Sequence, residues 1–129
     1  YDWTDATPAR ASLALAREEI AAGRQAVAVL RARLPDMIRG ARRGEFGDPE
    51  QVVALALTLE RLSETNLPRL FDIEERITNE IERFIDEVVV TDEMDITRFE
   101  LALVALEDER GRLLLDNQKQ IEASLSSGQ

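Results

Sequence analysis

The chain has 129 residues, of which 44% are hydrophobic, 33% are charged and only 5% are aromatic, so it suits one folded domain. It contains neither cysteine nor histidine, which excludes disulfides, thiol nucleophiles, the usual zinc sites and every mechanism that needs an imidazole. The formal net charge of −10 argues against nucleic acid or an anionic membrane surface as a partner, because both require a basic surface.

The first predicted element is a long helix over about residues 8–43. It starts at Thr7, which we predict to cap it, followed by Pro8. Small or apolar residues then recur at alternating spacings of three and four, a pattern typical of a face buried against partner helices. These residues are Leu13, Ala16, Ile20, Gly23, Val27, Leu30, Leu34, Met37 and Ala41. Because the pattern continues through Pro35, we predict one helix with a kink at this residue.

The second predicted helix covers about residues 49–90, and Asp48 is in a typical capping position before Pro49. Its apolar stripe extends from Val52 to Val88. Pro68 interrupts the stripe, so the sequence predicts a kink at Pro68 or a complete break there. A complete break would give four helices in place of three.

The third predicted helix covers about residues 96–126 and carries a further apolar stripe, with Gly111 in its middle. We expect the acidic residues at 92–95 to form a solvated turn before it. The three segments together predict an all-α fold, an elongated antiparallel bundle of three long helices with coiled-coil-like packing. We assign residues 1–129 to this single helical-bundle domain.

Arginines recur every seven residues along the first helix, at Arg10, Arg17, Arg24 and Arg31. We expect them to pair with acidic residues on neighbouring helices, and the alternative is an anion-binding site. The second helix offers Glu75, Asn79, Glu82 and Asp86 on one face. Without histidine, this face does not match a carboxylate-bridged di-iron centre.

Two further groups of polar residues are candidate functional positions. Arg110 and Asn117 lie close to the apolar stripe of the third helix, where they would fix the packing register or contact a small ligand. We favour a third interpretation, in which both point to solvent. The second group is Arg39, Arg42 and Arg43 at the end of the first helix, where we expect the positive charges to complement the helix dipole. The alternative is that these arginines form a binding patch for an anion or a protein partner. At Gly23 we expect two helix backbones to approach closely, and the alternative is a small cavity lined by this glycine.

We predict no catalytic, cofactor-binding or metal-binding residue, and no enzyme activity. The favoured function is a non-catalytic helical module for protein–protein interaction, scaffolding or signalling, with a helical partner or a homodimer. The first alternative is an extracytoplasmic sensory domain of a bacterial membrane receptor, such as a chemoreceptor or sensor kinase, which would bind a small molecule. The second alternative is a small all-helical enzyme that uses only Arg and Glu. A receptor domain would place both ends of the bundle together. No segment is apolar enough for membrane insertion, and we expect the bacterial cytoplasm or periplasm.

Overall fold

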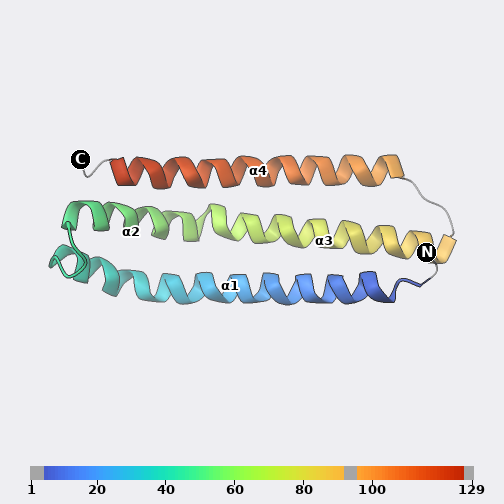
Figure 1. The fold of residues 1–129 in the computed structure, drawn as a ribbon, viewed down its shortest axis with the longest axis horizontal. Helices are drawn as coiled ribbons and strands as arrows, with labels where there is room; N and C mark the ends of the chain where they lie inside the picture. The colour runs from blue at the N-terminus through green and yellow to red at the C-terminus, as the bar shows by residue number, and fades with distance from the viewer. Residues whose placement is uncertain (1–4, 92–95, 127–129) are drawn as a thin grey trace.

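The computed structural model describes residues 5–91 and 96–126, and all regular structure in these two ranges is helical. The prediction of an all-α antiparallel bundle is therefore confirmed. The helices are α1 (Thr7–Arg42), α2 (Pro49–Glu64), α3 (Asn66–Thr91) and α4 (Ile96–Ser126). Helices α2 and α3 follow one another as a single rod bent at Thr65, which we call the central rod (Figure 1). Apart from this bend, the helix ends differ from the sequence-based ranges by one residue at most.

The three rods form an open layer, in which the central rod lies between α1 and α4 (Figure 1). Both flanking helices contact the central rod, but no Cα atom of α1 lies within 8 Å of a Cα atom of α4. In a closed three-helix bundle each helix would touch both others. The start of α1 and the end of α4 lie at opposite ends of the layer.

The helix starts follow local capping rules. Asp48 caps α2 as predicted, because its carboxylate accepts a hydrogen bond from the Glu50 backbone N–H at 3.1 Å. The predicted cap at Thr7 was wrong. Thr7 is already the first residue of α1, and its backbone N–H donates to Asp5 Oδ1 at 3.1 Å. Helix α1 then continues without interruption past Pro35.

The bend of the central rod lies three residues before Pro68. A proline has no N–H to donate, and its ring clashes with the carbonyl of the residue four positions earlier, here Glu64. Thr65 leaves helical geometry with φ −121° and ψ −85°, and α3 restarts at Asn66. Pro68 thus falls in the first turn of α3, where a missing N–H costs little. The predicted kink at Pro68 therefore needs correction to Thr65.

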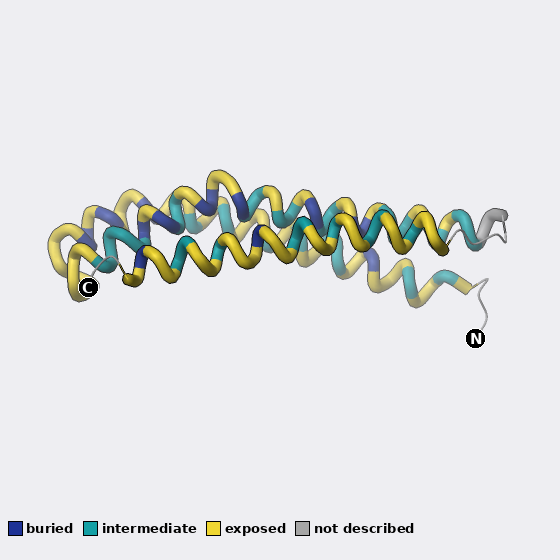
Figure 2. Tube along the Cα trace, turned by 90° about the horizontal axis from the view of Figure 1, so that it is seen from above, coloured by how far each residue is buried: buried dark blue, intermediate teal, exposed yellow. Residues whose placement is uncertain are grey.

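Two small apolar clusters hold the layer together, and most of the surface of the rods is exposed or half-buried (Figure 2). One joins α1 to α2 and the other joins α3 to α4. The first contains Leu30, Leu34, Ile38, Ala56 and Leu59; the second contains Leu70, Ile73, Ile77, Ile81, Leu103, Leu106 and Leu113. Met37, which we placed in the buried stripe, is 39% exposed, and Ile38 is buried instead. A step of four from Leu34 keeps Ile38 on the same helix face as Ala41.

Between the two clusters, Gly23 of α1 packs against Phe71 of α3. A Cβ atom added to Gly23 would lie 2.4 Å from Phe71 Cε1 and 2.7 Å from Phe71 Cζ. The ring therefore occupies the space that any larger residue would need, so the close contact at this glycine is with a side chain of α3. The acidic turn predicted at 92–95 lies outside the described residues.

Candidate functional site

The arginines of α1 form a ladder of ion pairs with the central rod. The pairs are Arg10–Asp86 at 2.7 Å, Arg17–Glu82 at 3.1 Å, Arg24–Asp72 at 2.9 Å, Arg24–Glu75 at 2.7 Å and Arg31–Glu64 at 3.8 Å. Asn79 also accepts a hydrogen bond from Arg17, at 3.0 Å. The predicted pairing is confirmed, and the acidic face of α3 is occupied by it. These side chains are about half exposed, so each pair contributes at most about 1 kcal/mol and mainly sets the register.

Arg110 and Asn117 both turn from α4 toward the central rod. Arg110 Nη1 lies 3.0 Å from Glu74 Oε1, and both side chains are about two-thirds buried. Asn117 Oδ1 accepts a hydrogen bond from Asn66 Nδ2 at 2.9 Å. The favoured interpretation, in which both residues point to solvent, was therefore wrong. Because they are seven residues apart and contact different partners, they do not form one site.

The bend of the central rod is tied to α4 by a network of polar side chains around Asn66. This buried residue donates to Asp116 Oδ2 at 2.7 Å as well as to Asn117. Gln120 also donates to Asp116 at 2.7 Å and accepts from Arg61 at 3.0 Å. The hydrogen bonds from Asn66 and Gln120 lower the pKa of Asp116. Asn66 was not among the predicted functional residues, and its polar type near the stripe was the available signal.

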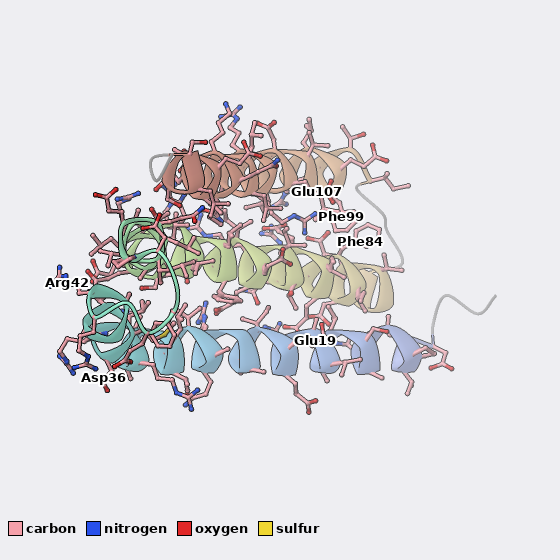
Figure 3. All side chains as sticks on the ribbon, turned by 60° about the vertical axis from the view of Figure 1, so that its left-hand side comes forward. Glu19, Asp36, Arg42, Phe84, Phe99 and Glu107 are labelled. Atoms are coloured by element: carbon pink, nitrogen blue, oxygen red, sulfur yellow. The ribbon has the colours of Figure 1, made fainter. Side chains whose placement is uncertain are left out.

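The arginines at the end of α1 do not form one cluster of free cations. Arg39 pairs with Asp36, and Arg43 Nε lies 3.0 Å from Glu45 Oε1. Arg42 borders a shallow surface hollow of about 410 Å³ together with Glu50, Val53 and Leu57. Figure 3 labels Asp36 and Arg42 at this end of the layer. Local carboxylates thus neutralise two of the three members of the predicted anion patch.

Large apolar side chains remain exposed on both flanking helices. Those of α1 and α4 are Leu15, Val29, Met37, Ile96, Leu101, Val104, Leu114, Leu115 and Leu125. Leu101 and Val104 reach 67% and 62% exposure, respectively. By contrast, Phe99 is half-buried, because its ring stacks on Phe84 of α3 with centroids 4.3 Å apart (Figure 3). The uncovered apolar surface thus lies mainly on the helices that have a single neighbour.

The ion-pair ladder defines one side of the layer, which we call the polar side. On α3, Arg69 lies three residues from the ladder residue Asp72, hence on the same helix face. It pairs with Glu109 of α4 at 3.1 Å. Asp116 follows Glu109 by seven residues and shares its face. The polar side therefore extends across all three rods.

The opposite side of the layer, which we call the apolar side, follows from helix geometry. Two residues along a helix correspond to a turn of about 200°. Leu15 and Val29 each precede a ladder arginine by two positions, Leu70 precedes Asp72 by two, and Leu114 precedes Asp116 by two. Ile81 follows Asn79 by two. These five residues define the apolar side, and each is exposed or half-buried. The Arg110–Glu74 ion pair shares this side, because Glu74 follows Leu70 by four residues and Arg110 precedes Leu114 by four.

A cavity of about 320 Å³ lies on the polar side, beside the bend. It is lined by Arg24, Arg31, Ser63, Phe71 and Asp72, among others, and its charged groups belong to the ladder.

Over the described ranges, no group of three or more acidic, Cys or His side chains could hold a metal, and none of the helices combines the length and the hydropathy that a membrane span requires. No family model, no curated protein and no solved structure matches the chain.

Proposed function

We propose that this chain is a non-catalytic helical interaction module that docks its apolar side on another helical surface. The observation that carries the proposal is the open layer, in which α1 and α4 contact only the central rod. Leucine and valine side chains on the side opposite the ladder therefore remain uncovered. Each Å² of apolar surface that a partner buries contributes about 25 cal/mol, so covering these side chains would favour binding.

Two side chains of the described residues have a shifted pKa, and both shifts are directed away from neutral pH. General acid–base catalysis works best when a group has a pKa near the operating pH. Here hydrogen bonds lower the pKa of the Asp116 carboxyl, and the neighbouring Glu80 raises the pKa of Arg83. Both groups consequently stay ionised at neutral pH. The remaining close contacts of charged side chains are mostly Arg–carboxylate pairs, which hold helices in register.

The arrangement of the helices favours this function over a receptor sensory domain. A sensory domain inserted between two membrane helices needs both its ends near one membrane surface. Helix α1 begins and α4 ends at opposite ends of the layer (Figure 1). The described helices alone do not provide the arrangement that a receptor domain requires, whereas a docking module has no such requirement.

Photo-cross-linking from single positions tests the proposal. A photoreactive amino acid at position 29 or 114 of the full chain, in the cells that produce it, should give cross-links to a partner. The matched control is position 57, because Leu57 is 41% exposed and Val29 is 40% exposed. Leu57 lies on the polar side, since it precedes the ladder residue Glu64 by seven positions and so shares its helix face. Equal cross-linking from all three positions, or none from any, would contradict the proposal.

A further inference from the structure

We infer that the cavity of about 320 Å³ beside the bend binds a small organic carboxylate with an apolar body, and that Arg31 holds the carboxylate group. The cavity lies on the polar side, so the inference goes beyond the proposed function, which concerns the apolar side. Three features of the cavity carry it, namely its apolar walls, the unused donors of Arg31 and the charges around them.

Apolar side chains from α1 and the central rod form much of the wall of the cavity. Val27 of α1 lines it together with Pro68 and Phe71 of α3, and all three are half-buried. Ala28 also lines it, and its single methyl group leaves the space open. Sites for small molecules have volumes of roughly 300–1,000 Å³ and mostly apolar walls with a few polar groups. The cavity therefore suits the apolar part of a small ligand.

Arg31 is the member of the ladder whose guanidinium is least engaged. Its Nη2 lies 3.8 Å from Glu64 Oε1, which is too far for a hydrogen bond. By contrast, Arg10, Arg17 and Arg24 donate to carboxylates at distances between 2.7 and 3.1 Å. A guanidinium has five N–H donors and can bind a carboxylate through two parallel hydrogen bonds. Within the described ranges no hydrogen bond uses the donors of Arg31, so they are available to a ligand in the cavity.

The other charges at the cavity favour an anion over a cation. Asp72 also lines the cavity, but its carboxylate accepts a hydrogen bond from Arg24 at 2.9 Å. A cationic ligand would have to displace this hydrogen bond, whereas an anion displaces none at Arg31. The net charge of −10 does not prevent binding, because salt screens charges beyond about 8 Å at physiological ionic strength.

The spacing of the two arginines sets the size of the ligand. Arg24 and Arg31 are seven residues apart, which corresponds to about 10.5 Å along α1. This length leaves room for one ring and a short chain between the Arg24–Asp72 pair and Arg31. The carboxylate of such a ligand competes with Glu64, which is the acidic partner of Arg31 in the ladder.

Titration of the full chain with hydrocinnamate, followed by NMR, tests the inference. This probe has a phenyl ring, two methylene groups and a carboxylate. We expect saturable shifts of the backbone amides near Ala28 and Phe71, with a Kd in the millimolar range for a ligand of about eleven non-hydrogen atoms. Hydrocinnamyl alcohol has the same body without the charge and should bind about tenfold more weakly. No saturable shift at millimolar hydrocinnamate, or equal binding of the two compounds, would overturn the inference.

Charge variants test the role of Arg31. Arg31→Gln should weaken hydrocinnamate binding about tenfold, to the level of the alcohol. The matched control is Arg33→Gln, which removes the same charge from an exposed residue of α1 that does not line the cavity, and should leave the Kd unchanged. Glu64→Gln removes the competing carboxylate and should strengthen binding, a gain that loss of structure cannot produce. Equal binding by Arg31→Gln and Arg33→Gln, or weaker binding by Glu64→Gln, would exclude Arg31 as the residue that holds the carboxylate.

A pair of alanine variants tests whether the probe occupies the cavity. Ala28→Leu places a larger side chain in the cavity and should abolish the shifts, while the circular dichroism of the helices stays the same. Ala26→Leu adds the same side chain at an exposed position outside the cavity and should bind the probe as the wild type does. Equal binding by both variants would place the probe elsewhere and overturn the inference. Cross-linking from position 114 concerns the other side of the layer, so either proposal can fail without the other.

Discussion

The contact between Gly23 and Phe71 gives the sharpest test of the packing, because a second helical glycine serves as its control. Gly23 and Gly111 both lie in helix interiors, where replacement of glycine by alanine stabilises a helix by about 1 kcal/mol. A Cβ on Gly111 would have no neighbouring atom within 4 Å, whereas a Cβ on Gly23 would lie 2.4 Å from Phe71 Cε1. The two substitutions should therefore have different effects on stability.

Gly111→Ala should raise the free energy of unfolding by about 1 kcal/mol. At Gly23 the same gain is opposed by overpacking, which typically costs 1–3 kcal/mol, so the net change should be a loss of about 0–2 kcal/mol. Phe71 borders the cavity beside the bend, and rotation of its ring into this space limits the loss. The two variants should differ by about 1–3 kcal/mol in urea unfolding followed by circular dichroism.

A double-mutant cycle locates the cause of the difference. In a Phe71→Ala background the methyl group of Gly23→Ala has room, so this substitution should again stabilise the chain by about 1 kcal/mol. The coupling energy between positions 23 and 71 should then equal the overpacking cost. Equal stabilisation by Gly23→Ala and Gly111→Ala in the wild-type background would show that Phe71 does not pack on Gly23, and would refute the reasoning.

Three further sets of substitutions test the network at the bend, the apolar cluster and the helix cap. Asn66→Ala should raise the pKa of Asp116 toward 3.8, as measured by an NMR titration. Because the native pKa of Asp116 lies below 3.8, its ionised carboxylate stabilises the fold above about pH 4, and this stabilisation is lost as the pH falls. The variant lacks this contribution and should therefore lose less stability in acid than the wild type. Leu34→Ala should cost about 2–5 kcal/mol and Arg24→Gln less than about 1 kcal/mol in urea unfolding, and equal losses would mean that the buried face is misassigned. Asp48→Ala should cost about 1 kcal/mol and Asp48→Asn much less, and equal losses would exclude the cap.

The helices could be predicted from the sequence because their signals are local. Alternating spacings of three and four marked the buried stripe of α1, and Asp48 with Pro49 marked the start of α2. Pairing of the arginine ladder also followed from the sequence, since a seven-residue repeat keeps every member on one flank of its helix. The exchange of Met37 for Ile38 changed one residue within a face that was otherwise assigned correctly.

The features that the sequence did not predict depend on contacts between rods. Pro68 is a local signal for a disturbed helix, but the clash of its ring acts one turn earlier, so the bend lies at Thr65. Arg110 and Asn117 each have a position near the edge of a stripe from which the side chain can reach either solvent or a neighbour. Their partners, Glu74 and Asn66, lie 36 and 51 residues away in sequence, and no local pattern identifies them.

The open layer itself follows from the number of apolar faces on each rod. Helix α1 buries one face against the central rod and its ladder arginines occupy one flank, so no second buried face remains for α4. The central rod buries Ala56 toward α1 and Ile73 toward α4, and it therefore keeps the two edge helices apart. Leu15, Val29 and Leu114 are then left exposed. A partner that covers them binds the folded layer and not the unfolded chain, so docking on the apolar side should raise the stability of the fold as partner concentration rises.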